Sequence, residues 1–250
     1  MASIVLDTVN VDLPIFDAHQ RSLRHSVMAM TVGGVISQKG RFRHVRALDS
    51  VSLSIGDGDR IGLIGRNGAG KTTLLRVLAG ICEPTNGRAA VDGTVSNLLA
   101  MRSLLDPEMN GYENIEHASL LLGMSRGALP ALIRDVEEFT ELGPFLDMPV
   151  RTYSAGMQVR LSFALLTAPT PDILLLDEVL GAGDAGFAAK AAKRIDQLRN
   201  RSRILVLASH AQDQILDWCD RVLWLDHGRL VAFGPAREIL DDYRQSLAQS

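Results

Sequence analysis

The stretch GLIGRNGAGKTTLLRVLAG, residues 62–80, contains two glycines separated by four residues, and the second is followed directly by lysine and threonine. The apolar run that leads into it favours a buried strand, and the spacing of leucine and valine after it favours a helix. A glycine-rich loop at this junction lets consecutive backbone N–H groups face phosphate oxygens, and the helix N-terminus adds positive potential. The stretch therefore predicts a phosphate-binding loop in an α/β fold.

Side chains in this loop have predicted roles toward a nucleotide. Lys71 is long enough to reach the β- and γ-phosphates, and the Thr72 hydroxyl is a suitable oxygen ligand for Mg²⁺. The other residues predicted to contact the nucleotide are Gly65, Arg66, Asn67, Gly68, Ala69, Gly70 and Thr73. A glycine-rich turn without function would not require strand, loop and helix to follow in this order.

The composition is that of an ordinary globular protein. The 250 residues are 46% hydrophobic and 22% charged, and no apolar run approaches the roughly 20 residues of a membrane-spanning helix. The first residues alternate apolar and polar and do not resemble a signal peptide, so we expect a cytoplasmic location. Two isolated cysteines, Cys82 and Cys219, are expected to be buried thiols in a reducing compartment.

The charge distribution argues against a nucleic-acid partner. The formal net charge is −3, and the arginines are scattered without interleaved aromatic residues. One basic concentration, residues 21–46, also holds His25 and His44. A solvated or interfacial face accounts for it, and a surface near anionic lipid is the alternative.

The pattern along the chain predicts a mixed sheet with an inserted helical lobe. Residues 4–13 and 45–55 alternate strictly, as half-exposed antiparallel strands do, whereas ILLL (173–176) and ILVL (204–207) are continuous, as strands covered on both faces are. Helical patterns replace strand patterns between residues 98 and 168. We therefore expect one domain, 1–250, with an α/β core from 1–97 and 169–250 and a helical subdomain from 98–168.

Two further strands end in residues suited to phosphate chemistry. DILLLDE, residues 172–178, delivers Asp177 and Glu178 to the carboxyl end of the predicted sheet, where ligands bind in open α/β folds. Asp177 is predicted to hold Mg²⁺, and Glu178 to align or deprotonate the attacking water. The alternative for such a pair is an exposed strand end. RILVLASH, residues 203–210, places His210 at the same edge, where a γ-phosphate would lie, although an isolated histidine is more often structural.

With these elements in this order, the chain resembles the nucleotide-binding subunit of ATP-binding cassette (ABC) transporters, a P-loop NTPase fold, over nearly its whole length. In that family a turn of the type Leu-Ser-Gly-Gly-Gln opens a helix of the helical lobe, and YSAGMQ, residues 153–158, stands at the corresponding place. The resemblance implies that this turn contacts ATP bound to a second copy of the chain, so that two cassettes form a homodimer around two nucleotides. The residues concerned are Ser154, Ala155, Gly156 and Met157.

Other residues receive roles from the same resemblance. Phe42 matches the aromatic residue that stacks on adenine, with a half-buried strand residue as the alternative; Asp184, in GAGD, resembles the aspartate that couples the two sites, and His210 the histidine that senses γ-phosphate. The chain departs from the family pattern at the loop that usually bears a glutamine. Its aligned position falls near Ala100 or Met101, with Asn97, Arg102 and Ser103 as nearby polar residues.

The combination of YSAGMQ with GAGDAGF, residues 181–187, looks most like ATPase subunits that export polysaccharide, namely O-antigen, capsule and teichoic acid exporters. The resemblance implies an ATPase that uses ATP and Mg²⁺ to power export of a lipid-linked glycan. Its partner would be a separate transmembrane permease subunit, which holds it at the cytoplasmic face of the inner membrane. Residues 13–41 would be an insertion lying against the membrane, and no carbohydrate-binding domain is expected at the C-terminus.

Two alternatives to polysaccharide export stay open. The same cassette could serve an importer or a drug or lipid exporter. An ABC ATPase that acts on DNA or ribosomes is the other, but such proteins usually have long coiled coils or two cassettes in one chain, and this sequence has no heptad run and no basic stripe.

Overall fold

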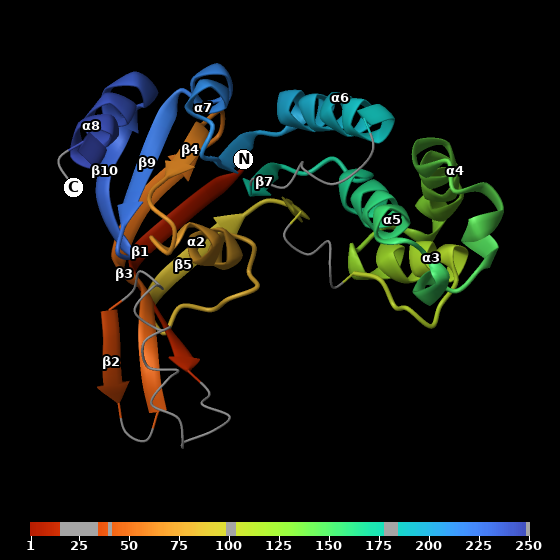
Figure 1. Cartoon of the computed structure of the whole chain (residues 1–250), viewed down its shortest axis with the longest axis horizontal. Coiled ribbons are helices and arrows are strands. Elements are labelled where there is room, and N and C mark those ends of the chain that lie inside the picture. Colours follow the sequence, from red (N-terminus) through yellow and green to blue (C-terminus); the bar gives the residue numbers. More distant parts are fainter. Residues whose placement is uncertain (16–34, 40–41, 99–103, 178–184, 249–250) are drawn as a thin grey trace. The chain divides into compact units, whose positions relative to one another are not determined.

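The computed structural model describes residues 1–15, 35–39, 42–98, 104–177 and 185–248. Figure 1 shows the chain, which divides into two compact units. Unit 1 comprises Met1–Thr94 and Arg203–Ser250, and unit 2 comprises Val95–Ser202.

Unit 1 begins with an antiparallel sheet whose strands are ordered β2-β3-β1-β5. Leu6 lies opposite Leu53, and Ile4 lies opposite Ile55, so alternate residues of both strands face the core. Val5, between the two buried residues, is exposed. The strands are β1 (Ser3–Ile15), β2 (Val35–Lys39), β3 (Phe42–Gly56) and β5 (Asn86–Asp92).

A second group of strands in unit 1 is largely parallel. Strand β4 (Arg60–Ile64) pairs in parallel with β8 (Ile204–Ala208) and with β9 (Arg221–Asp226), and β9 pairs antiparallel with β10 (Arg229–Pro235). All of β8 and nearly all of β4 are buried, as expected for strands covered on both faces. The helices of this unit are α2 (Lys71–Leu78), α7 (Gln212–Trp218) and α8 (Ala236–Ala248).

Unit 2 is mainly helical, with one short parallel pair of strands. Its strands are β6 (Val95–Asn97) and β7 (Ile173–Asp177). Its α-helices are α3 (Gly111–Leu121), α4 (Leu129–Thr140), α5 (Ala155–Thr167) and α6 (Ala185–Arg201). In the described part of this unit, short 3₁₀ helices lie between α3 and α5: η3 (Arg126–Ala128), η4 (Gly143–Asp147) and η5 (Val150–Thr152). Helices α3, α4 and α5 share a core that includes Ile115, Leu132, Val136, Leu161 and Leu165.

The segment GYENI, residues 111–115, opens α3, and the residues around its start fix the helix N-terminus. Asn110 caps the helix by accepting a hydrogen bond from Glu113 N, and the Glu113 carboxylate accepts one from Asn110 N. Asn114 is buried, and its amide donates to the carbonyls of Asp106, Met109 and Asn110. These bonds fix the loop that precedes α3.

The structure confirms the mixed sheet class, the antiparallel N-terminal strands, the buried strands at 173–176 and 204–207, and helices between residues 98 and 168. The boundaries at 97/98 and 168/169 stay a prediction. Residues 13–41, expected as an insertion, include strand β2, which pairs with β3. The expectation that Cys82 is buried is wrong, because it lies half-buried in the turn after α2. Cys219 is buried, and neither cysteine is in a disulfide. Within the described residues, no helix has the length and apolar character needed to cross a bilayer.

Candidate nucleotide-binding site

The predicted phosphate loop, residues 65–72, lies between β4 and α2. Three of its glycines have positive φ: Gly65 at 148°, Gly68 at 79° and Gly70 at 106°. A Cβ at Gly65 would lie 2.2 Å from the Leu225 carbonyl oxygen, and a Cβ at Gly70 would lie 2.6 Å from that of Ala47. Both positions therefore require glycine for its conformation and for its lack of a side chain.

The loop leaves polar groups available for an anion. Arg66, Asn67, Gly68 and Thr72 are exposed, and the first turn of α2 has no acidic residue that would repel phosphate. The Lys71 ammonium donates hydrogen bonds to the carbonyl oxygens of Gly65, at 2.7 Å, and Arg66, at 3.2 Å. The lysine thus lies folded over the loop that it is predicted to serve.

A turn between β9 and β10 supports the loop from one side. Gly228 N donates to the Ala69 carbonyl at 2.9 Å, and the Gly228 carbonyl accepts from Asp49 N on β3 at 2.9 Å. Gly228 has a φ of 79°, and a Cβ there would lie 2.7 Å from the Ala47 oxygen. Sequence patterns could not reveal this support, because Gly228 and Asp49 are far from the loop along the chain.

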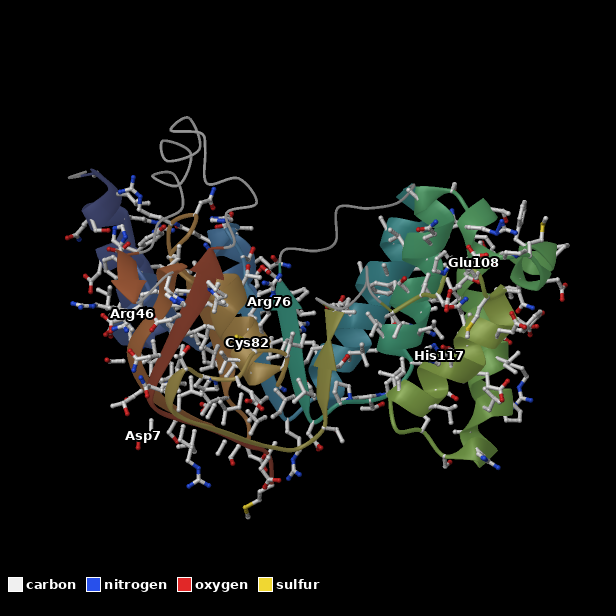
Figure 2. All side chains as sticks on the ribbon, turned by 90° about the horizontal axis from the view of Figure 1, so that it is seen from below. Asp7, Arg46, Arg76, Cys82, Glu108 and His117 are labelled. Atoms are coloured by element: carbon white, nitrogen blue, oxygen red, sulfur yellow. The ribbon has the colours of Figure 1, made fainter. Side chains whose placement is uncertain are left out.

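Charged side chains reinforce this support. Arg229 donates to the Asp49 carboxylate at 2.7 Å, and this hydrogen bond lowers the pKa of Asp49 below its usual range. Arg46, labelled in Figure 2, lies 3.5 Å from the other Asp49 oxygen and donates to Asp12 at 2.9 Å. The network therefore connects β1, β3 and β10 beside the turn that holds the phosphate loop.

Replacing Gly228 with alanine is expected to destabilise the protein more than replacing Gly58. Both glycines have positive φ, but nothing lies within 4 Å of a Cβ at Gly58, whereas one at Gly228 would collide with Ala47. We expect Gly58→Ala to lower the free energy of unfolding by about 1 kcal/mol, through the cost of its backbone conformation alone. Gly228→Ala should lower the free energy of unfolding by about 2 kcal/mol more, because of the collision, and should also weaken ATP binding. Urea unfolding and calorimetric ATP titration measure both, and equal losses in the two variants would contradict the support argument.

Strand pairing places His210 at the same sheet edge as the loop. Leu63 of β4 lies opposite Ala208 of β8, so Gly65 and His210 each follow two residues beyond this pair. His210 is exposed, and the preceding Ser209 is buried, donating to the Gln214 side chain and accepting from Ala211 N, both at 3.1 Å. These bonds turn the chain sharply after β8.

The predicted metal ligand Asp177 is the last residue of β7 in unit 2 and is half-buried, as a strand-end carboxylate should be. Thr72 and Asp177 offer a hydroxyl and a carboxylate oxygen, which are ligand types that Mg²⁺ accepts, and this ion commonly takes its other ligands from phosphates and water. The residue types therefore fit the ion. Glu178, Asp184, Ala100, Met101, Arg102 and Ser103 lie outside the described residues.

Phe42, the predicted adenine contact, begins β3 and pairs with Lys39. The structure describes its backbone but not its side chain. The backbone of Asn97 ends β6. The predicted roles of these two residues stay predictions.

The turn at YSAGMQ opens α5 in unit 2. Ser154 is the N-cap, and its hydroxyl accepts a hydrogen bond from Met157 N at 3.3 Å. Tyr153 is buried, and its hydroxyl donates to the Phe145 carbonyl at 2.7 Å; burial raises its pKa above the usual value. Tyrosine at this position therefore anchors the turn through a hydrogen bond, a role that the sequence comparison with the family pattern did not suggest.

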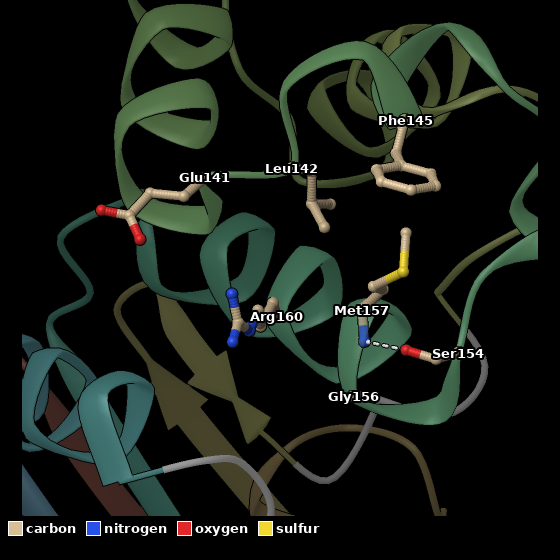
Figure 3. Close-up of a pocket in the computed structure, with 7 residues that line it drawn as sticks. All are labelled: Glu141, Leu142, Phe145, Ser154, Gly156, Met157 and Arg160. Atoms are coloured by element: carbon tan, nitrogen blue, oxygen red, sulfur yellow. Dashed lines mark hydrogen bonds between the residues drawn. The ribbon is translucent and has the colours of Figure 1, made fainter.

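The outer face of this turn is open. Ser154, Ala155 and Gly156 are exposed, and a Cβ at Gly156 would meet only the Ser154 hydroxyl, at 3.9 Å. No contact within its own described surroundings thus demands glycine here. Figure 3 shows the adjoining pocket, about 340 Å³ in volume, which combines apolar and charged side chains. It is lined by Glu141, Leu142, Phe145, Ser154, Gly156, Met157 and Arg160.

Known proteins resemble this chain in sequence and in fold. Residues 48–181 match the family model described as ABC transporter. The O-antigen export system ATP-binding protein RfbE of Yersinia enterocolitica is 44% identical over 229 residues, which cover 91% of this chain and 96% of RfbE. The teichoic acids export ATP-binding protein TagH of Lactococcus lactis is 38% identical over 199 residues. These residues cover 80% of this chain and 42% of TagH. The fold is similar to that of the ATP-binding cassette MJ0796, solved as a dimer in a post-hydrolysis state, with a TM-score of 0.66. The match covers 94% of this chain and 99% of the MJ0796 chain, and at 19% identity it shows a likeness of fold alone.

Proposed function

The chain belongs to the ABC transporter family, and on that premise we propose that it is the ATP-hydrolysing subunit of a polysaccharide exporter. The cargo would be a lipid-linked glycan, and a separate transmembrane subunit would form its path across the cytoplasmic membrane. The observation that carries this proposal is the relation to RfbE, an O-antigen export protein that this chain matches over almost the full length of both. The relation to TagH, a teichoic acids export protein, points to the same class of polymer.

The residues of unit 1 suit the binding of ATP. The N–H groups of the phosphate loop and the N-terminus of α2 would bind the phosphates, with Lys71 moving from its carbonyl partners to the β- and γ-phosphates. Phe42 would stack on the adenine ring. Mg²⁺ held by Thr72 and Asp177 would offset the charge of the phosphate oxygens.

Hydrolysis requires an oriented water molecule and a group that responds to the γ-phosphate. Glu178 follows the buried strand β7 directly, and we assign it to align that water and accept its proton. His210, at the sheet edge beside the phosphate loop, would donate a hydrogen bond to the γ-phosphate. Both assignments use a position at the carboxyl end of a parallel strand, because Glu178 directly follows β7 and His210 lies two residues after β8.

The Ser154 turn would complete the site of a second subunit. Ser154, Ala155 and Gly156 are exposed, and the open space at Gly156 would allow a phosphate to approach the backbone at the helix N-terminus. Two chains would close head to tail over two ATP molecules, with Asp184 coupling the two sites. ATP would therefore favour the closed dimer by charge-assisted hydrogen bonds that form only there.

The site of action follows from this assignment. The chain would bind peripherally at the cytoplasmic face of the inner membrane through the transmembrane subunit. Closing and opening of the two cassettes would be passed to that subunit, which binds the glycan. Residues 13–41 would lie toward the membrane.

Changing Glu178 to glutamine should preserve ATP binding, abolish steady hydrolysis and trap the dimer, because the amide cannot accept the proton from water. Light scattering should show 27.1 kDa without nucleotide and twice that mass with Mg-ATP. Adding Ser154→Arg should return the mass to that of the monomer, because bulk and charge then occupy the dimer contact. Full turnover by Glu178→Gln would refute the role of Glu178.

Changing Gly156 to leucine in the Glu178→Gln background tests the open face of α5. Gly127 is the matched control, because a Cβ at either glycine meets at most one atom, and none closer than 3.9 Å. We expect both variants to keep their melting temperature within about 2 °C. Only Gly156→Leu should prevent the ATP-dependent dimer, and an intact dimer would show that no second subunit approaches this turn.

The exported cargo is tested in cells of the source organism that lack the chain. Wild-type protein should restore glycan at the cell surface, whereas Glu178→Gln should leave lipid-linked glycan accumulated inside. Surface labelling and lipid extraction measure the two pools. Normal surface glycan without the chain would exclude polysaccharide export and favour an importer or a drug or lipid exporter of the same family.

A further inference from the structure

Three helices of unit 2 meet in a cluster of phenylalanines. Phe139 of α4 stacks on Phe163 of α5, with ring centroids 5.6 Å apart and planes at 15°. Phe187 of α6 meets both rings edge-on, at 5.5 Å and 5.8 Å. Phe163 and Phe187 are buried. Aromatic pairs in these geometries add to the free energy of burial and restrict sliding of the helices.

Arg194 ties α6 to α4 beside this cluster. One guanidinium nitrogen donates to Asp135 at 2.9 Å, and the second donates to the other carboxylate oxygen. The same guanidinium lies over the Phe139 ring, 4.0 Å from its centroid. Asp135 and Phe139 are one helical turn apart on α4, so Arg194 contacts this helix twice, through the ion pair and through the aromatic ring. The Arg194 side chain is only 16% exposed, which makes this pair stronger than an ordinary surface ion pair.

Two further contacts extend the connection along α6 and α5. Lys190, one turn before Arg194, pairs with Glu141. Arg160 of α5 lies 5.4 Å from the centre of the Phe187 ring and donates to the Thr140 carbonyl at 3.4 Å. Arg160 also lines the pocket beside the Ser154 turn (Figure 3). The contacts thus reach from the start of α6 to the first half of α5.

Both connected helices begin directly after residues assigned to the reaction. Helix α5 follows Ser154, and α6 begins at Ala185, next to Asp184 in the sequence. Phe187 is in the first turn of α6. We propose that Asp135, Arg194 and Phe187 are positioning residues, which hold α4, α5 and α6 as one rigid group so that the two helix starts keep the spacing needed for turnover. This inference rests on the proposed function.

The positioning role differs measurably from a purely structural one. A group that only stabilises the fold changes the melting temperature and leaves the turnover of folded protein unchanged. A group that positions the two helix starts changes kcat, while the KM for ATP stays close to wild type because the phosphate loop lies in unit 1. The conservative variant Arg194→Lys keeps the charge but loses the two-point grip, so it should be intermediate.

The experiment is a double-mutant cycle on the full chain with Asp135→Asn, Arg194→Gln and both together. We expect each single change to lower kcat about tenfold, with KM for ATP within about twofold of wild type. The double variant should be no slower than either single variant, because all three break the same contact. The matched control is Asp57→Asn with Arg203→Gln, an exposed ion pair of unit 1 with a 2.8 Å contact, which should leave kcat unchanged.

Wild-type kcat in Arg194→Gln, or equal losses in the control pair, would overturn the inference. Hydrogen exchange without nucleotide supplies a readout that does not need activity. Arg194→Gln should speed exchange of amides in the first turns of both α5 and α6, and unchanged exchange in both would also overturn the inference. If wild-type protein itself fails to hydrolyse ATP, the proposed function fails, and the exchange experiment still decides whether the three helices are held together.

Discussion

The structure depends on a loop that must present bare backbone to phosphate. Such a loop needs glycines with positive φ, and a flexible glycine loop would lose much of its binding free energy to ordering. Here the neighbouring strands supply the order. The carbonyls of Leu225 and Ala47 press against Gly65 and Gly70 so closely that no Cβ fits, and Gly228 holds Ala69 by a hydrogen bond. Segments distant in sequence thus converge to keep a short loop in one conformation.

The glycine at the start of α5 meets the opposite situation. Gly156 has open space around it, and Ser154, which caps the helix, is exposed. Contacts inside the chain explain the glycines of the phosphate loop, whereas no contact among the described residues explains the glycine at position 156. This contrast agrees with the roles that the family resemblance implies, in which the phosphate loop binds the chain's own ATP and the Ser154 turn contacts the ATP of a second subunit.

Local patterns were sufficient to predict the strand, loop and helix around residues 62–80, the antiparallel pair β1 and β3, and the helix that starts at Ser154. Each of these is specified within a short window by glycine spacing, alternation or a capping residue. Strand β5 was missed because NGRAAVD has small, mostly exposed side chains and pairs only along one edge with β1. The support from Gly228 and the phenylalanine cluster could not be found either, since each joins residues far apart in sequence. Phe139, Phe163 and Phe187 separately look like ordinary apolar positions on three helices.

The rigid group in unit 2 has a consequence for how binding free energy is used. ATP can shift the equilibrium between open and closed cassettes only through contacts that differ between the two states. In the proposed dimer those contacts form at the Ser154 turn, a few exposed atoms at the end of one helix. If α5 could tilt independently, its displacement would be absorbed by local rearrangement and would not reach other elements. Because Phe163, Phe187 and the Arg194 contact with Asp135 join α5, α6 and α4, a force on the turn moves all three helices together. In the proposed dimer, the cluster would therefore pass a local contact with phosphate on to the whole group of helices.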